Sequence, residues 1–188
     1  MPVGLLGGAF DPPHNGHVVL AREALEGFDL ERLLVLVVAS PGHKQVSAAL
    51  EDRLELARLA FAGLPRTEVV AEKHPYTVDS VRGGGFGDAV FLVGADEFAD
   101  FLTWRDPDAV LGDVRLAVAT RPGYPQEPLD DVLARLERPD RVEFFEIPPV
   151  PVSSSEIRKR VANGEPVTEL VPPAVARRIV ELGLYHAR

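Results

Sequence analysis

The stretch VGLLGGAFDPPHNGH at residues 3–17 sets the expectation for the whole fold. Its first part, Val3 to Leu6, is a short apolar run that ends in Gly7-Gly8, as a buried strand does before a turn. Apolar residues at helical spacing follow from about Asn15 to Leu25. A strand, a glycine turn and a helix in this order predict a βα unit whose loop, residues 9–14, lies at the carboxyl end of the strand.

The same alternation continues along the chain. Leu33 to Ala39 (LLVLVVA) is nearly all aliphatic and β-branched, which is typical of a strand buried on both faces of a parallel sheet. Further strands are expected at residues 67–71, 89–93, 114–120 and 142–147, and further helices at residues 50–61 and 129–136. This pattern, with right-handed crossovers, predicts an α/β fold: a Rossmann-like doubly wound parallel sheet with helices on both faces.

One domain is expected to span residues 1–188, because this length suits a single α/β unit. Its last part, residues 153–188, is expected to form a C-terminal helical segment, with two helices separated by Gly164-Glu165-Pro166. Two stretches are expected to be loops, the Pro/Gly-rich residues 121–128 and the flexible, glycine-rich residues 82–88.

Composition limits the function classes. A net charge of -9 argues against nucleic-acid binding, which needs a broad basic surface, but a few local cations can still attract a small phosphorylated substrate. The absence of cysteine excludes disulfides and thiolate metal sites. No signal peptide is recognisable, and no apolar run approaches the roughly 18 residues of a membrane helix. No membrane association and a cytoplasmic location are therefore expected.

His14 and His17 are the first candidate catalytic residues. Histidines three positions apart at a helix start lie on one face, near the N-terminal N–H groups that favour anions. Metal binding is an alternative use, but no third and fourth ligand lie nearby. A structural alternative makes one histidine a helix cap and the other a core residue.

A second candidate site is VSSSEIR at residues 152–158. Ser153 and Glu156 have the spacing of a capping box, which predicts a helix start. The serine hydroxyls, the free backbone N–H groups and Arg158 one turn later could together form an anion site. The alternative is a well-capped helix without a ligand.

The two motifs together resemble the HxGH and ISSTxIR signatures of the nucleotidyltransferase superfamily, with Val and Ser in place of Ile and Thr in the second. That superfamily includes nicotinate-nucleotide and pantetheine-phosphate adenylyltransferases and glycerol-phosphate cytidylyltransferases. The resemblance implies that His14 and His17 contact the nucleotide triphosphate and stabilise its pentavalent transition state. It also implies that Arg158 binds the triphosphate and that ATP is held by Gly8, Ala9, Phe10, Ser153 and Ser154.

Three further segments resemble the bacterial nicotinate-nucleotide adenylyltransferases within that superfamily. PGHK at residues 41–44 resembles their PxHK-like segment, with Gly42 where a second proline is common, and implies that Lys44 contacts phosphate. PYTVDS at residues 75–80 resembles their SYTVDT segment. GAD at residues 94–96, followed by a tryptophan, resembles their GAD…W arrangement.

These segments imply where the two substrates lie. By resemblance, Gly94 and Asp96 hold the nucleotide around its ribose, and Trp104 stacks on the pyridine ring of the second substrate. Tyr76 and Thr77 belong to the same substrate pocket.

The resemblance implies an enzyme of NAD biosynthesis that transfers the adenylyl group of ATP to nicotinic acid mononucleotide. The attacking phosphate is ionised at pH 7, so catalysis needs positioning and charge stabilisation, not a general base. Mg²⁺ is expected to arrive on the ATP phosphates, because the sequence offers no dedicated carboxylate cage. The alternatives are nicotinamide mononucleotide or phosphopantetheine as acceptor, and a non-catalytic nucleotide sensor. A monomer and a homodimer both fit.

Overall fold

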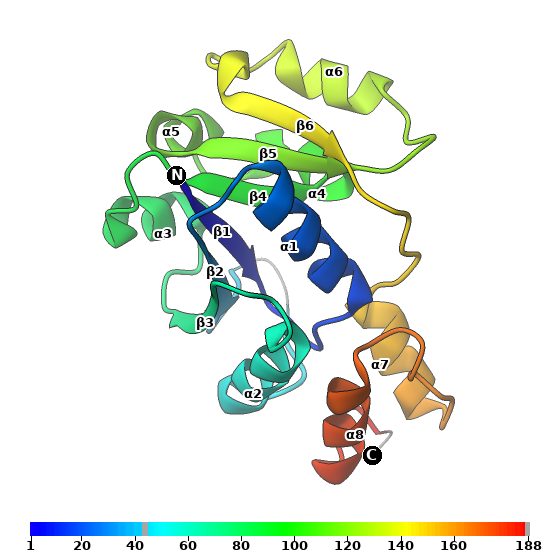
Figure 1. Cartoon of the computed structure of the whole chain (residues 1–188). Helices are drawn as coiled ribbons and strands as arrows, with labels where there is room; N and C mark the ends of the chain where they lie inside the picture. The colour runs from blue at the N-terminus through cyan, green and yellow to red at the C-terminus, as the bar shows by residue number, and fades with distance from the viewer. Residues whose placement is uncertain (43–44, 187–188) are drawn as a thin grey trace.

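Six parallel strands form the centre of the molecule (Figure 1). The structure is a computed structural model and describes residues 1–42 and 45–186. The strands are β1 (Val3–Gly8), β2 (Arg32–Val38), β3 (Thr67–Glu72), β4 (Val90–Gly94), β5 (Arg115–Thr120) and β6 (Val142–Glu146). They lie in the order β3-β2-β1-β4-β5-β6, and every neighbouring pair is parallel. The predicted doubly wound sheet is confirmed.

Helices cover both faces of this sheet. One face carries α1 (Asn15–Gly27), α2 (Leu50–Phe61), α7 (Ser154–Ala162) and α8 (Pro173–Glu181). The other carries α3 (Thr77–Gly84), α4 (Ala95–Ala99), α5 (Pro107–Asp113) and α6 (Glu127–Leu133). Two short 3₁₀ turns, Phe101–Thr103 and Pro139–Arg141, complete the described elements.

The uniformly apolar sequence of β2 follows from this layering. Leu33, Val35 and Val37 belong to the core under α1 and α2, whereas Leu34 and Leu36 belong to the core on the opposite face. Alternate side chains of a strand point to opposite faces, so a strand covered on both sides needs apolar residues at every position.

Some predicted boundaries were wrong. β1 continues through Gly7 and Gly8, because these glycines still pair with Leu36 and Val37 of β2. The predicted loop at residues 82–88 is helical over its first three residues, and α3 ends only where Gly85 adopts a left-handed conformation with φ of 59°. The helix predicted at residues 129–136 instead spans Glu127–Leu133.

The sheet topology places the site. The chain runs outward from β1 to β2 and β3 on one side, and β4, β5 and β6 lie on the other. Strand order therefore reverses between β1 and β4, and ligands of such sheets bind outside the carboxyl ends of the strands at this point. The loop at residues 9–14 and Gly94 at the end of β4 both lie there. None of the helices in the described ranges has the length and apolarity that a membrane span requires.

Candidate active site

The two histidines lie together at the N-terminus of α1. His14 is the N-cap residue, and His17 is the third residue of the helix. Their rings stack with centroids 3.7 Å apart, and the His14 backbone N–H donates to His17 Nδ1 at 3.2 Å. Because Nδ1 accepts this hydrogen bond, a neutral His17 carries its proton on Nε2.

His14 is neutral at pH 7. Burial lowers the pKa of its imidazole to about 4, because a charged ring in that position would lose most of its hydration. In the protein without ligand, His14 is therefore a neutral hydrogen-bonding group and not a fixed cation.

Gly16 allows this arrangement of rings. A Cβ atom at this position would lie 3.1 Å from His14 Nδ1 and 3.3 Å from Val152 Cγ1. A side chain there would push against both the catalytic candidate and the residue that precedes the second motif. The glycine between the two histidines is thus explained by close packing, since its own φ is not in the left-handed region.

The two sequence motifs meet in space although about 140 residues separate them. The Ser154 hydroxyl donates to the Pro12 carbonyl at 2.8 Å, and Arg158 Nη1 donates to the Asp11 carbonyl at 2.7 Å. Figure 1 shows the N-terminal end of α1 beside α7. The loop after β1 and the N-terminus of α7 are therefore parts of one structure.

The N-terminus of α7 is capped by Ser153 as predicted, but only one of the two hydrogen bonds of the capping box forms. Ser153 is the N-cap residue, and its hydroxyl oxygen accepts from the Glu156 backbone N–H at 3.1 Å. The reciprocal half of the predicted capping box is absent, because the Glu156 carboxylate pairs with Arg160 at 2.7 Å. Arg158 also reaches the Ser155 hydroxyl at 3.3 Å, so its guanidinium lies over the first turn of the helix.

Phe10 occupies a different position from the other ATP-binding candidates. Its ring is buried and packs edge-on against His17, with centroids 5.0 Å apart, and against Phe61 at 5.8 Å. A nucleotide contact from Phe10 therefore has to come through its backbone, as for its neighbours Gly8 and Ala9.

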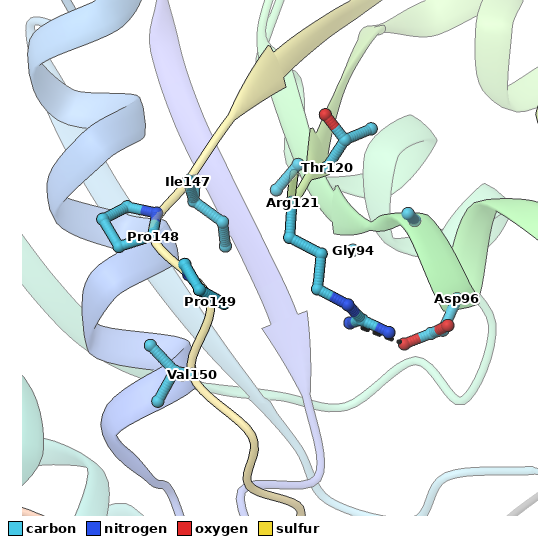
Figure 2. Close-up of a pocket in the computed structure, with 11 residues that line it drawn as sticks. Gly94, Asp96, Thr120, Arg121, Ile147, Pro148, Pro149 and Val150 are labelled. Atoms are coloured by element: carbon cyan, nitrogen blue, oxygen red, sulfur yellow. Dashed lines mark hydrogen bonds and ion pairs between the residues drawn. The ribbon is translucent and has the colours of Figure 1, made fainter. Parts of the chain in front are cut away.

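A pocket lies next to the histidines, at the carboxyl ends of β4 and β5 (Figure 2). It is lined by Gly16, Gly94, Ala95, Asp96, Ala119, Thr120, Arg121 and residues 147–150. The structure thus brings the candidates Gly94 and Asp96 close to α1. Figure 2 shows the Arg121 side chain extending across the pocket to Asp96, where the guanidinium lies 3.5 Å from the carboxylate. Sequence reasoning missed Arg121, although its position directly after a central strand marks it.

The pyridine-site candidates form a separate group. Tyr76 is the N-cap residue of α3 and Thr77 its first residue. The guanidinium of Arg105, which follows Trp104 directly, lies 5.0 Å from the centroid of the Tyr76 ring. The half-buried Trp104 ring packs edge-on against Phe101 at 5.1 Å.

Glu72 fixes the segment that leads to Tyr76. Its carboxylate accepts hydrogen bonds from Ser80 Oγ at 2.5 Å and from the backbone N–H of His74 at 2.8 Å, and its second contact with His74, to ring Nδ1, is also 2.8 Å. Burial raises the pKa of Glu72, but these hydrogen bonds outweigh that effect and lower the pKa overall. Glu72 was not among the candidates, because a single glutamate at the end of a strand carries no sequence signal.

Lys44 lies outside the described residues, as does His43. The residue before them, Gly42, lies against Tyr76, because a Cβ atom on Gly42 would be 3.0 Å from the tyrosine ring. Gly42 therefore lies beside the pyridine-site candidates.

The candidates thus fall into three neighbouring groups along the carboxyl edge of the sheet: the histidines with α7, the pocket at β4 and β5, and the group around Tyr76. Gly16 connects the first two, because it packs on His14 and also lines the pocket. Within residues 1–42 and 45–186, the third group is held by contacts of Tyr76 with Arg105 and of Trp104 with Phe101. In the same ranges, no three His, Asp or Glu side chains gather as a metal site would require.

Comparison with known proteins identifies relatives over the full length. The cytidylyltransferase-like family matches residues 5–160. A protein of Rubrobacter xylanophilus named "Probable nicotinate-nucleotide adenylyltransferase" is 38% identical over 200 residues, covering 100% of this chain and 93% of its own. Proteins of the same name from Bordetella avium (39% identical, 97% of both chains) and Thermus thermophilus (38% identical, 98% of this chain and 100% of its own) are equally similar.

Solved structures share the fold. The nicotinic acid mononucleotide adenylyltransferase of Plasmodium falciparum complexed with NaAD superimposes with a TM-score of 0.78 at 14% identity, over 98% of this chain and 97% of its own. Its complex with APC gives a TM-score of 0.76, again at 14% identity, over 98% and 96%.

Replacement of Gly16 by alanine should displace His14 by a few tenths of an ångström and lower turnover, because the new methyl group would lie only 3.1 Å from His14 Nδ1. The expected loss of kcat is at least about tenfold, the effect of a small misplacement of a catalytic group. Gly27→Ala is the matched control, since it lies in the same helix with no atom near a Cβ. Steady-state kinetics that find both variants equally active would contradict the packing argument.

Acidification should destabilise the protein partly through His14. The native pKa of about 4 lies below the ordinary value of 6.5, so between these pH values the unfolded chain binds a proton that the native state does not. The free energy of unfolding should therefore fall by up to about 3 kcal/mol as the pH drops through this window, and His14→Asn should remove that part of the slope. Urea denaturation at several pH values measures this. An unchanged slope in His14→Asn would refute it.

Proposed function

The chain belongs to the cytidylyltransferase-like family and, within it, to the nicotinate-nucleotide adenylyltransferases, and we propose which of its residues bind each substrate and which stabilise the transition state. The enzyme transfers the adenylyl group of ATP to nicotinic acid mononucleotide, which gives deamido-NAD and pyrophosphate, a step of NAD biosynthesis. A phosphate oxygen of the mononucleotide attacks the α-phosphorus of ATP, and the bond from that phosphorus to the bridging oxygen of pyrophosphate breaks.

The observation that best supports a triphosphate site is that the two sequence motifs are in contact. The N-termini of α1 and α7 share the loop at residues 9–12 through the bonds from Ser154 and Arg158. Two helix N-termini with a guanidinium between them bind a polyphosphate well, because their N–H groups and positive ends favour anions. ATP phosphates bound there would contact His14, His17, Arg158, Ser153 and Ser154.

Catalysis at this site is charge stabilisation. A neutral His14 and a His17 with its proton on Nε2 can donate hydrogen bonds to phosphate oxygens, and these bonds strengthen as charge builds up on the leaving pyrophosphate. Arg158 supplies a permanent positive charge beside them. Lys44, which the structure does not describe, would add a second.

The pocket at β4 and β5 suits the adenosine part of ATP. It begins at Gly16 beside the histidines, so a nucleoside there continues directly from the phosphates. Gly94 offers its backbone and Asp96 an exposed carboxylate, a group that accepts hydrogen bonds from ribose hydroxyls.

The group around Tyr76 suits nicotinic acid mononucleotide. Trp104 presents a partly exposed aromatic face for the flat pyridine ring. The first N–H groups of α3, from Thr77 onward, and the adjacent Arg105 provide a positive environment for the carboxylate that distinguishes the acid from the amide.

Mg²⁺ fits this arrangement as a companion of ATP. The donor groups of the triphosphate site are imidazoles, hydroxyls and a guanidinium, which suit phosphate oxygens, and the described residues hold no carboxylate cluster for an independent metal. Bound Mg²⁺ would neutralise part of the phosphate charge. The cytoplasmic location and the homodimer stay predictions.

A coupled assay of pyrophosphate release with Mg²⁺ and ATP tests the proposal. Nicotinic acid mononucleotide should give a much higher kcat/KM than nicotinamide mononucleotide, and phosphopantetheine should give no detectable turnover. Preference for nicotinamide mononucleotide would overturn the recognition of the carboxylate by α3 and Arg105, and preference for phosphopantetheine would overturn the pyridine site around Tyr76. Binding of ATP without turnover on any acceptor would favour a nucleotide sensor.

Removal of the His17 donor should cost about 2–4 kcal/mol of transition-state stabilisation, or roughly 30-fold to 10³-fold in kcat, by analogy with loss of one oxyanion donor. His17→Gln is the matched variant, because its amide can still donate a hydrogen bond. It should retain more activity than His17→Ala. Near-normal kcat in His17→Ala would contradict the role of His17 in the reaction.

A further inference from the structure

A buried carboxylate lies at the centre of the triphosphate loop. Asp11 is only 3% exposed. Its Oδ2 accepts from the Ser47 backbone N–H at 2.6 Å, and its Oδ1 accepts from the Ala48 backbone N–H at 3.1 Å and from the Tyr185 hydroxyl at 2.8 Å. A carboxylate at this depth is stable only when its oxygens are hydrogen-bonded, so these three donors are structural requirements.

Side chains of α2 and of α7 hold the backbone of the same loop. Arg53, which is 1% exposed, donates to the Ala9 carbonyl at 2.8 Å. Its other donors reach the carbonyls of Val38, Ala39 and Ala48, so it fastens the loop to the end of β2 and to the start of α2. From α7, Arg158 and Ser154 donate to the carbonyls of Asp11 and Pro12, as described above.

Tyr185 connects this loop to the end of the chain. It lies beyond α8, in a left-handed conformation with φ of 65°, and its ring packs on the core beneath α1 and α2. Burial and then the negative charge of Asp11 raise the pKa of its hydroxyl, which therefore stays protonated and remains a donor at every physiological pH.

We propose that Tyr185 is a positioning residue of the triphosphate site, which acts through Asp11 to hold the loop before His14. The inference rests on the proposed function, because that function assigns the loop and the histidine to ATP. In this role, the Tyr185 hydroxyl affects the affinity for ATP without touching the nucleotide.

The physical reason is the free-energy cost of leaving the buried Asp11 carboxylate without one of its hydrogen-bond donors. When the tyrosine donor is lost, Asp11 regains solvation only if the loop moves or water enters. Asp11 precedes His14 by three residues, and its other oxygen holds the backbone three residues after Lys44. A shift of the carboxylate would therefore move the backbone that leads to His14 and the backbone at Ser47 together.

Tyr185→Phe tests the proposal, because it removes one hydroxyl and keeps the packed ring. Calorimetric titration of the full-length protein with Mg-ATP should give a Kd about tenfold higher than that of the wild type, the size of one hydrogen bond to a charged group, with unchanged stoichiometry. Irreversibly unfolded protein would lower the stoichiometry, whereas reversible unfolding would raise the apparent Kd in inverse proportion to the folded fraction. A circular dichroism melt of Tyr185→Phe therefore accompanies the titration, and a Kd about tenfold higher in a variant that is fully folded at the titration temperature separates positioning from stability.

Arg178→Met is the matched control. Arg178 fastens α8 to α2 through the Glu55 carboxylate, at 3.0 and 3.1 Å, and is not among the contacts of the phosphate loop. This variant should lower the melting temperature but leave the Kd for Mg-ATP within about twofold of the wild type. An equal loss of ATP affinity in Arg178→Met would show that only the docking of α8 matters, and would overturn the role of the hydroxyl.

A double-mutant cycle tests whether Tyr185 affects ATP binding through Asp11. Asp11→Asn turns an amide toward backbone N–H groups that need an acceptor, so it should weaken ATP binding on its own. In that background Tyr185→Phe should have no further effect, whereas independent effects would overturn the route through Asp11. If Asp11→Asn does not fold, the comparison of Tyr185→Phe with Arg178→Met decides alone.

The remaining outcomes separate this inference from the proposed function. A Kd of Tyr185→Phe within twofold of the wild type would overturn the positioning role, whatever the acceptor. A wild type that binds ATP but releases no pyrophosphate would overturn the adenylyl transfer and still allow the Kd comparison to decide. A wild type that binds no ATP would overturn both.

Discussion

The buried charge of Asp11 is the constraint around which the site is arranged. Its carboxylate takes donors from the segment before α2 and from Tyr185, while Arg53 and Arg158 hold the backbone on either side of it. Each contact comes from a different part of the chain, so the loop after β1 can adopt this form only when α2, α7 and the C-terminal tail are docked. The cost of leaving a buried carboxylate or carbonyl unpaired couples formation of the site to completion of the fold.

The parallel sheet supplies the location for this loop, and the C-terminal helices supply its second half. β1 and β4 are neighbours at the point where strand order reverses, which opens a crevice at their carboxyl ends. The sheet alone would give only the histidines and the pocket at β4 and β5. The chain continues after β6 across this edge, and α7 then brings Ser154 and Arg158 to the first loop. This explains why the two signatures lie near opposite ends of the sequence.

The fold class and the family could be predicted from the sequence, but the contacts that hold the site together could not. All six strands were predictable, and the central ones most clearly, because strands covered on both faces must be apolar at nearly every position, as in LLVLVVA. Arg53 was not, since an arginine in a helix usually indicates an exposed face; its spacing with Leu56, Ala57 and Ala60, all buried, was the available signal. The pairs Asp11–Tyr185 and Glu72–Ser80 leave no signal in the sequence, because they depend on how separate elements meet in three dimensions.

If the N-termini of α1 and α7 form one triphosphate site, a single bound nucleotide must contact both. A crystal structure of the protein with Mg²⁺ and a non-hydrolysable ATP analogue shows whether it does. We expect phosphate oxygens within about 3 Å of the His17 ring and of donors on Ser153, Ser154 or Arg158 in the same bound molecule. Phosphates that contact only one of the two helix ends, or neither, would contradict it.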